Sequence, residues 1–255
     1  MSQDDLIHGL HAVQAAVRYE PAGVVEAWVE RRRRDGRMQR LRRQLQGLGC
    51  PVHEVERREL DRLTGSDAHQ GVAIRYRGPP PRGDDELAQL LDGLARAPFL
   101  LVLDQVQDPH NLGACLRTAE GAGVDAVITP RDRAAGLTPA VHKVAAGAAE
   151  TLPLFQVTNL ARALRDLRER GIWLVGAADT AAASLYDTDL TGSLALVLGA
   201  EENGLRRLTR EACDQLVAIP MAGRVESLNV SVAAGVMLYE AVRQRAAAVQ
   251  RRVQG

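Results

Sequence analysis

Short apolar runs alternate with amphipathic segments along the C-terminal part of the chain. Residues 99–103 read FLLVL without a polar interruption, which is typical of a strand buried on both faces of a parallel sheet. The segments between such runs carry apolar residues at helical spacing. The predicted strands lie at residues 99–103, 124–128, 172–175, 194–198 and 216–219, and the predicted helices at residues 111–121, 138–146 and 160–169. This order predicts a doubly wound α/β domain over residues 96–245, with ligands at the carboxyl ends of its strands.

The last predicted unit, residues 216–245, consists of a strand, a polar loop and a long helix. Pro220 ends the strand because proline cannot donate to a ladder. Either Ser227 or Asn229 can cap the helix by accepting hydrogen bonds from its first amides. From Val230 onward the apolar residues share one helical face. The SLNVS sequence of the loop has more polar side chains than a purely structural turn requires.

The first 77 residues also alternate between strand and helix patterns. The predicted strands lie at residues 24–29, 52–55 and 72–76, and the predicted helices at residues 7–17, 41–47 and 60–63. This alternation is typical of a small α/β layer fold. The sequence GPPPR, followed by acidic residues, predicts a Pro-rich acidic linker over residues 78–95. We therefore expect domains at residues 1–77 and 96–245 and a basic tail at residues 246–255.

The composition is that of an ordinary globular protein. The chain has 255 residues, 46% of them hydrophobic, and no apolar run approaches the roughly 20 residues that a membrane span needs. The acidic start, MSQDDLIHGL, lacks a signal-peptide core. We therefore expect a cytoplasmic protein with no membrane partner. The three cysteines are widely spaced, which argues against a disulfide framework or a metal site.

Positive charge is concentrated between residues 31 and 43. Eight arginines fall within these thirteen positions, and Asp35 is the one acidic residue among them. They can form a solvated face, or they can contact an RNA backbone, whose phosphates attract arginine. The formal net charge of zero argues mildly against a nucleic-acid-binding protein. No aromatic residue interleaves with the arginines, so stacking on single-stranded bases is not predicted.

Three polar turns follow three of the predicted strands, at the edge where a ligand is expected. They are DQVQDPHNLGACLRT at residues 104–118, LVLGAEENGLRR at residues 196–207 and SLNVS at residues 227–231. The first two turns each have a purely structural interpretation in isolation, since Asn111 can cap a helix and Glu201 can complement a helix N-terminus. The sequence has no G-x-G-x-x-G motif, so a nucleotide-dependent oxidoreductase is not indicated.

Taken in order, Asn-x5-Arg, GAExxG and IPMxGxxxSLNVS resemble the three motifs of the SpoU branch of the SPOUT RNA methyltransferases. IHGLHAV near the start and AHQGVAI at residues 68–74 are similar to the N-terminal domain of ribosomal RNA ribose methyltransferases, which is L30e-like in fold. The resemblance implies a parallel-sheet SPOUT domain with a deep trefoil knot, and a homodimer. Glu202 departs from the family pattern, because relatives often have glycine there.

The resemblance also implies a reaction and a site. The reaction is methyl transfer from S-adenosyl-L-methionine to a ribose 2′-hydroxyl, with a guanosine of 23S ribosomal RNA as the expected substrate and no metal. The residues that it implies are the cofactor-binding set Gly199, Ile219, Met221 and Leu228, and the catalytic set Arg117, Asn111, Glu201, Ser227 and Asn229.

Two questions stay open at the level of sequence. Arg117 can act as the base that removes the hydroxyl proton, or as a cation that stabilises the developing alkoxide. The first role conflicts with the chemistry of arginine, because arginine stays protonated in proteins. The substrate can instead be a transfer RNA, or the chain can be a non-catalytic RNA-binding or ribosome-assembly factor. The N-terminal domain favours ribosomal RNA, and no motif residue is lost.

Overall fold

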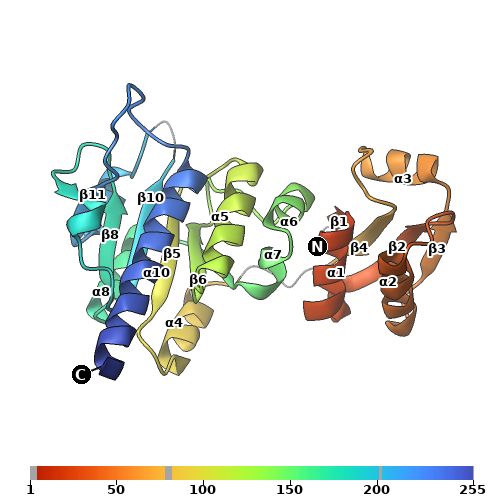
Figure 1. Ribbon diagram of the computed structural model, residues 1–255, viewed down its shortest axis with the longest axis horizontal. Coiled ribbons are helices and arrows are strands. Elements are labelled where there is room, and N and C mark those ends of the chain that lie inside the picture. The colour runs from red at the N-terminus through yellow and green to blue at the C-terminus, as the bar shows by residue number, and fades with distance from the viewer. Residues whose placement is uncertain (1–4, 78–81, 201–202, 255) are drawn as a thin grey trace. The chain divides into compact units, whose positions relative to one another are not determined.

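The chain folds into two compact units, each with its own sheet (Figure 1). The structure, a computed structural model, describes residues 5–77, 82–200 and 203–254. The first unit combines the residues up to position 80 with residues 136–151. The second unit combines residues 81–135 with residues 152–255.

The first unit is built on a four-stranded sheet with the strand order β1-β4-β2-β3. The strands are β1 (Asp5–His8), β2 (Val24–Glu30), β3 (Val52–Val55) and β4 (Val72–Tyr76), and the helices are α1 (Leu10–Tyr19), α2 (Gly36–Gly47) and α3 (Arg57–Thr64), with a 3-10 turn at Pro21–Gly23. Successive strand residues face opposite sides of the sheet. Ile74 therefore packs with α1 and α2, while Ala73 packs with Leu60 of α3.

The start of the first unit differs from the helix predicted at residues 7–17. Ile7 is fully buried in β1, which pairs with β4, and α1 begins only at Leu10. Gly9 separates the two elements at φ 96°, a conformation that residues with a side chain rarely adopt. The Gln70 side chain accepts a hydrogen bond from the Leu10 amide at 3.0 Å. Pairing with a strand far along the chain thus overrides the local helical pattern.

Residues 136–151 pack with the first unit, although the sequence pattern places them within the second domain. They form α6 (Pro139–Ala145) and α7 (Ala148–Thr151), both of which contact α1, and α6 also contacts β1. His142 Nδ1 lies 2.7 Å from Glu150 Oε1, and the His142 ring meets the Tyr76 ring edge-on. Local periodicity identifies such a helix but not the core in which it is buried.

The second unit contains a seven-stranded parallel sheet with the order β7-β6-β5-β10-β8-β11-β9. Its strands are β5 (Phe99–Asp104), β6 (Ala126–Pro130), β7 (Leu154–Val157), β8 (Trp173–Ala177), β9 (Ala183–Ser184), β10 (Leu194–Gly199) and β11 (Gln215–Ala218). Leu100, Leu101, Val102 and Leu103 have no exposed surface, so β5 is buried on both faces as its apolar run predicts. The predicted parallel α/β domain is confirmed, with β7 and β9 as additional strands.

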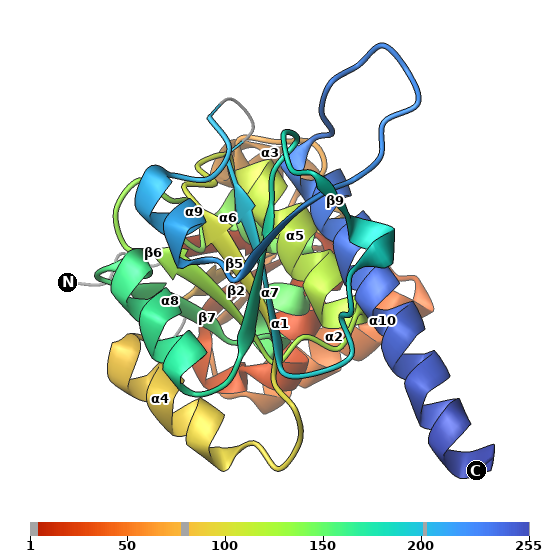
Figure 2. The same cartoon turned by 90° about the vertical axis from the view of Figure 1, so that its left-hand side faces the viewer.

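Helices cover both faces of the second sheet. They are α4 (Asp84–Gly93), α5 (Pro109–Gly121), α8 (Leu160–Glu169), α9 (Arg207–Ala212) and α10 (Val230–Gln254), with a 3-10 turn at Leu185–Asp187. Figure 2 shows α4, α8 and α9 on one face and α5 with α10 on the other. α10 continues through the residues predicted as a separate tail. None of the helices in the described ranges is both long and apolar enough to cross a membrane.

The predicted linker at residues 78–95 contains a packed helix. Within α4, Leu87 and Leu91 are buried in the core of the second unit. The Glu86 carboxylate accepts a hydrogen bond from the amide of the N-cap residue Gly83 at 2.6 Å, which stabilises the start of the helix. The acidic residues that suggested a linker lie in the first turn of this helix, where negative charge complements the helix dipole. The linker prediction is therefore wrong from Asp84 onward.

Candidate active site at the carboxyl ends of three parallel strands

The first motif turn joins β5 to α5. Asp108 caps the helix, because its carboxylate accepts a hydrogen bond from the His110 amide at 2.6 Å. Asn111 is therefore not the cap but lies within the first turn of α5. Arg117 lies further along the same helix and its side chain is exposed. The cap leaves the Asn111 side chain available for another part of the fold.

That other part is the third motif turn, which precedes α10. Asn229 Nδ2 donates to Asn111 Oδ1 at 3.0 Å. Asn229 Oδ1 accepts from the backbone N and the Oγ of Ser231 at 2.9 and 2.6 Å, so Asn229, rather than Ser227, caps the helix. Because Ser231 holds the oxygen of this amide, the Asn229 side chain can present only its NH2 group to Asn111.

The second motif turn folds back tightly after β10. Ala200 and Gly204 form a bridge, and the Gly204 amide donates to the Ala200 carbonyl at 2.9 Å. A Cβ atom on Gly199 would lie 2.0 Å from the carbonyl carbon of Gly204, and Gly204 itself has φ 59°. Glycine is therefore sterically required at position 199, and the positive φ of Gly204 favours glycine there. The predicted site residue Glu201, with Glu202, lies outside the described residues.

An ion pair that the motif comparison did not identify joins the first turn to the second. Asp104 ends β5 and has no exposed surface. Its carboxylate accepts from the backbone N of Arg206 at 3.0 Å and from Arg206 Nε at 2.7 Å. A signal is present in the sequence, because Asp104 closes an otherwise apolar strand, and a buried carboxylate needs a partner. The sequence does not reveal which cation supplies it.

A cavity of about 1120 Å³ lies where β8, β10 and β11 end. All four residues of the predicted cofactor-binding set line it, namely Gly199, Ile219, Met221 and Leu228. Ser227 of the predicted catalytic set lines it as well, whereas Asn111, Arg117 and Asn229 do not. The structure thus brings five predicted residues to one cavity, and the Asn111–Asn229 hydrogen bond ties its rim to α5.

Three polar side chains from outside the motifs complete the cavity wall. Asp179 and Thr180 follow β8, and Arg210 belongs to α9. Arg210 Nη2 donates to Thr180 Oγ1 at 3.1 Å, which joins the loop after β8 to α9. The cavity therefore combines an apolar glycine-containing side with a polar side.

Thiol chemistry finds little support around this cavity. Cys213 is a free thiol, and burial, with smaller contributions from Asp214 and Asp104, raises its pKa to about 12. Such a thiol stays protonated near neutral pH and is neither a nucleophile nor a metal ligand. Across the described ranges, no three His, Cys, Asp or Glu side chains are arranged to hold a metal ion.

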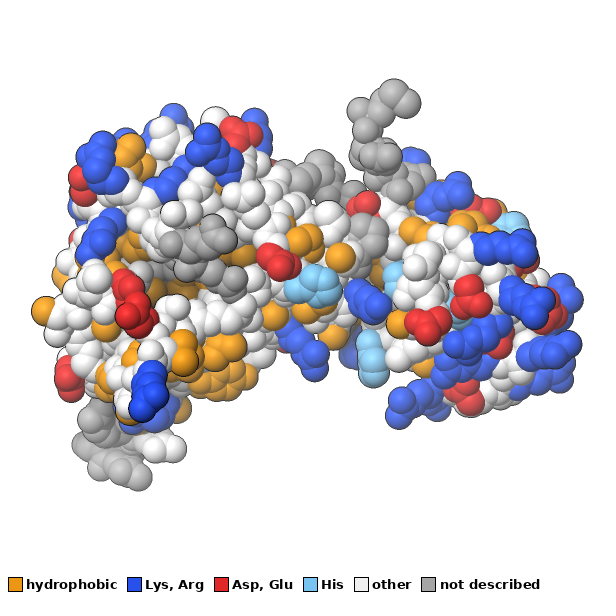
Figure 3. Space-filling view, turned by 90° about the horizontal axis from the view of Figure 1, so that it is seen from above, with side chains coloured by type: hydrophobic (Ala, Val, Ile, Leu, Met, Phe, Trp, Pro, Cys, Tyr) orange, Lys and Arg blue, Asp and Glu red, His pale blue; other side chains and the backbone are white. Residues whose placement is uncertain are grey.

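The arginines of residues 31–43 divide into two groups in the structure. Ion pairs engage four of them, Arg31 and Arg32 with Glu56, Arg33 with Asp35, and Arg42 with Glu54. The others, Arg34, Arg37, Arg40 and Arg43, are exposed and form no ion pair within the described residues. The last three are spaced three residues apart on α2 and share one side of the helix. Figure 3 shows basic side chains gathered over the first unit.

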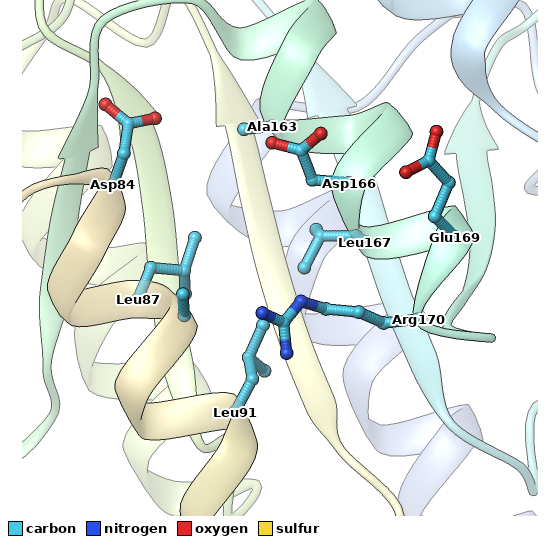
Figure 4. Close-up of a pocket in the computed structure, with 9 residues that line it drawn as sticks. Asp84, Leu87, Leu91, Ala163, Asp166, Leu167, Glu169 and Arg170 are labelled. Atoms are coloured by element: carbon cyan, nitrogen blue, oxygen red, sulfur yellow. The ribbon is translucent and has the colours of Figure 1, made fainter.

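A smaller hollow of about 380 Å³ lies between α4 and α8 (Figure 4). Leu87, Leu91 and Leu167 form its floor, and Asp166 lies at its rim. The Arg170 side chain reaches across to Asp92 of α4, with 2.5 Å between Nη1 and Oδ1. None of the residues that line this hollow belongs to the three motif turns. It is a gap between two helices that the Asp92–Arg170 ion pair spans.

Two family models match the chain. The SpoU rRNA Methylase family matches residues 98–239. A model described as RNA 2′-O ribose methyltransferase substrate binding matches residues 6–82.

Proteins named 23S rRNA (guanosine-2′-O-)-methyltransferase RlmB are similar over nearly their whole length. The protein from Shewanella oneidensis is 51% identical over 245 residues, which cover 96% of this chain and 99% of that protein. The protein from Vibrio cholerae is 52% identical over 244 residues, covering 96% and 98%.

Solved structures show the same architecture. A crystal structure of an RNA 2′-O ribose methyltransferase aligns with a TM-score of 0.80 at 28% identity, covering 96% of this chain and 90% of that chain. The SpoU methyltransferase AviRb from Streptomyces viridochromogenes, in complex with the cofactor AdoMet, aligns with a TM-score of 0.80 at 25% identity, covering 96% and 91%.

Proposed function

Because the chain belongs to the SpoU rRNA methylase family, we propose that it transfers a methyl group from S-adenosyl-L-methionine to the ribose 2′-hydroxyl of a guanosine in 23S ribosomal RNA. Near-full-length similarity to relatives of that name supports the substrate. The observation that carries the proposal is the meeting of the three motif turns at one edge of the sheet. The Asn111–Asn229 hydrogen bond joins the first turn to the third, and the Asp104–Arg206 pair joins the first to the second.

The cavity at this edge suits the cofactor. S-adenosyl-L-methionine supplies a methyl group already activated as a sulfonium. Gly199, Ile219, Met221 and Leu228 would hold it, since they line this cavity. Its volume of about 1120 Å³ is somewhat above the roughly 300–1,000 Å³ of common ligand sites, so the cofactor has room to enter. The backbone of Gly204 and Leu205 fills the space beside the Gly199 Cα, so Gly199 would contact the cofactor through its own backbone.

The chain's own side chains would then orient the sugar and manage its charge. We assign Arg117 to the developing negative charge on the 2′-oxygen, because a guanidinium that stays protonated is a better cation than base. Asn111 and Asn229 hold one another at 3.0 Å, so their loops are fixed before substrate binds. Ser227 at the cavity wall, and Glu201, are proposed to orient the substrate and the loop.

We also propose that residues 1–77 form the L30e-like RNA-binding domain. The family model over residues 6–82, described as substrate binding, supports this assignment. Of the arginines in this region, Arg37, Arg40 and Arg43 on α2 and the adjacent Arg34 have the exposed guanidinium groups that an RNA backbone requires.

A homodimer, a trefoil knot in the second unit and a cytoplasmic location belong to the same proposal. Support for the homodimer comes from exposed apolar side chains on and before α10. Val225, Val232 and Tyr239 are each more than half exposed, and apolar patches of this kind mark protein interfaces. The knot and the location rest on the family resemblance.

Methyl transfer from labelled S-adenosyl-L-methionine to separate pools of unmodified 23S, 16S and transfer RNA tests the proposed function. We expect label in 23S RNA alone, and a ribose-methylated guanosine when the site is mapped. Label confined to transfer RNA would reject the ribosomal substrate. Binding to 23S RNA without any transfer would indicate an RNA-binding factor on a methyltransferase fold.

A further inference from the structure

The buried carboxylate of Asp104 engages only one side of the Arg206 guanidinium. It accepts hydrogen bonds from Nε and from the backbone N, whereas Nη1 and Nη2 make no hydrogen bond to any part of the chain that the structure describes. The Arg206 side chain is 41% exposed, and that of Asp104 is fully buried. The guanidinium is thus fixed at one end and presents two NH2 groups at the other. Such a fork matches the oxygens of a phosphate or a carboxylate.

The position of the Arg206 guanidinium indicates which kind of oxyanion it can bind. Gly199 lies beside Asp104 in the register of β5 and β10, and Gly199 and Leu205 line the cofactor cavity. Arg206 itself does not line that cavity. An anion bound by Arg206 therefore lies next to the cavity but outside it. A backbone phosphate of a bound RNA meets this condition better than the carboxylate of a cofactor enclosed in the cavity.

We propose that Arg206 binds a backbone phosphate of the substrate RNA beside the cofactor cavity, and that Asp104 is the positioning residue that fixes its guanidinium. The inference rests on the proposed function. Because Asp104 already orders the Arg206 side chain, phosphate binding costs little rotamer entropy. A phosphate held at this edge of the sheet fixes the register of the nucleotide chain relative to the three motif turns.

The neighbouring Arg207 provides a matched comparison. Its side chain is 76% exposed and pairs with Glu211 one turn along α9, with 2.8 Å between Nη1 and Oε1. It carries the same charge at the next position but is not held by a buried carboxylate. If RNA were attracted only by general positive charge, Arg206 and Arg207 would contribute alike. A specific phosphate contact makes Arg206 alone important.

The test compares three variants of the full-length chain. Replacing Arg206 alone would leave Asp104 buried without its cation, so the main variant is the double substitution Asp104→Asn/Arg206→Gln, which removes both charges. Arg206→Lys keeps the charge but loses the fork, and Arg207→Gln is the control. Affinity for an unmodified 23S RNA transcript is measured over a series of KCl concentrations. Affinity for S-adenosylhomocysteine and the melting temperature are measured in parallel.

The two amide side chains of the double variant can still hydrogen-bond to one another and keep the two turns joined. We therefore expect this variant to bind S-adenosylhomocysteine as the wild type does and to bind RNA at least about tenfold more weakly, as the loss of a hydrogen bond to a charged group implies. The slope of log affinity against log salt should fall in magnitude by about 0.7, the value for one phosphate on a single strand. Arg206→Lys should fall between the wild type and the double variant, and Arg207→Gln should leave both quantities unchanged.

Three results would overturn the inference. Unchanged RNA affinity and salt slope in the double variant would show that the pair only locks the two turns together. Equal losses of RNA affinity in the double variant and in Arg207→Gln would show that Arg206 contributes only general positive charge. Weaker S-adenosylhomocysteine binding with unchanged RNA binding would assign Arg206 to the cofactor carboxylate. A wild-type protein that neither binds nor methylates 23S RNA would instead refute the proposed function, and this inference with it.

Discussion

Gly199 shows how a single residue type can be imposed by the path of the chain. The turn after β10 returns so closely that the backbone of Gly204 and Leu205 occupies the space where a side chain on Gly199 would lie. The same turn borders the cofactor cavity. The steric requirement and the proposed contact with the cofactor therefore meet at one position.

The substitution Gly199→Ala should open this turn. A Cβ atom there would lie 2.0 Å from the Gly204 carbonyl carbon, so the backbone must move. We expect the dissociation constant for S-adenosylhomocysteine to rise at least about tenfold, as misplaced ligand contacts imply, with a lower melting temperature. Calorimetric titration measures the first and thermal unfolding the second.

Gly192→Ala is the matched control, because a Cβ atom on Gly192 meets nothing within 4 Å. It should change neither quantity. Wild-type cofactor affinity in Gly199→Ala would contradict the assignment of this turn to the cofactor.

Substitution of Arg117 tests the proposed catalytic part of the site. Arg117→Ala should lower kcat by about 10²–10³, the range measured when one oxyanion-stabilising group is removed. Affinity for S-adenosylhomocysteine should stay at the wild-type value, because Arg117 does not line the cavity. Single-turnover methyl transfer and calorimetry separate the two effects.

Two further variants help to interpret the result for Arg117→Ala. Arg165→Ala removes an exposed helical arginine of α8 and should leave kcat unchanged. Arg117→Lys separates the two proposed roles. A retained cation gives partial activity with a flat pH profile, whereas a base gives activity that rises as the lysine loses its proton. Near-normal turnover in Arg117→Ala would remove this residue from the mechanism.

At the scale of elements, the sequence predicts well what its local pattern determines. The apolar run of β5 predicts a strand buried on both faces, and the polar turns predict the edge of the sheet at which the cavity lies. β1 is different, because Ile7 fits either a helix or a strand and its pairing with Ile74 decides. The sequence fails to predict α4 for another reason. The acidic first turn of α4 resembles a linker, and only the structure shows that Leu87 and Leu91 are buried.

For the site as well, the sequence predicts some residues and not others. Motif spacing leads to Gly199 and Leu228, which line one cavity. It does not lead to Arg206, because only the fold shows which cation reaches the buried Asp104. Nor does it show that Asn229 donates to Asn111, a contact between turns 118 residues apart. Pairings between distant segments depend on tertiary structure, which local sequence patterns do not encode.

The two groups of arginines near α2 give a prediction at this scale. Arg37→Gln/Arg40→Gln removes two exposed cations that have no ion-pair partner within the described residues. We expect weaker binding to 23S RNA, and a salt dependence smaller in magnitude by about 1.4, which corresponds to two single-strand phosphates. Filter binding over a KCl series measures both.

The control for these arginines is Arg31→Gln/Arg32→Gln, which removes two cations that already pair with Glu56 at 3.6 and 3.7 Å. This control should change the slope of log affinity against log salt less than Arg37→Gln/Arg40→Gln does, because Glu56 already offsets part of the charge of Arg31 and Arg32. Equal slopes for the wild type and the Arg37→Gln/Arg40→Gln variant would show that this side of α2 faces solvent and not RNA.

At the scale of the whole molecule, residues 136–151 belong to one unit by packing and to the other by sequence. Val141, Ala145 and Ala148 of this segment are buried in the unit that also contains α1 and β1. Removing the N-terminal 82 residues would therefore expose apolar surface on α6 and α7. The described residues that line the proposed cofactor cavity, in contrast, all belong to the second unit.

A chain that begins at Gly83 should accordingly keep its affinity for S-adenosylhomocysteine and lose most of its affinity for 23S RNA. Limited proteolysis should cleave it within residues 136–151, where the full-length chain resists. Calorimetry and mass spectrometry of the fragments provide the readouts. Loss of cofactor binding in this truncated chain would show that the site depends on the N-terminal unit.

The proposed homodimer gives the last prediction. Val232 and Tyr239 are 51% and 52% exposed, and their spacing of seven residues places them on one face of α10. Glutamates at both positions should dissociate a dimer, because charges buried without partners in an interface are strongly unfavourable. Analytical ultracentrifugation should find the wild type as a dimer and Val232→Glu/Tyr239→Glu as a monomer. Val249→Glu, a change at an exposed position on another side of α10, is the control.

The same pair of variants links assembly to the cofactor. Met221 and Val225 are exposed apolar side chains in the loop before α10, and that loop borders the cavity. If a partner subunit covers this loop, the monomeric variant should bind S-adenosylhomocysteine more weakly while Val249→Glu binds it normally. A wild-type protein that sediments as a monomer would refute the dimer. A monomeric variant with full cofactor affinity would show that each subunit builds its cavity alone.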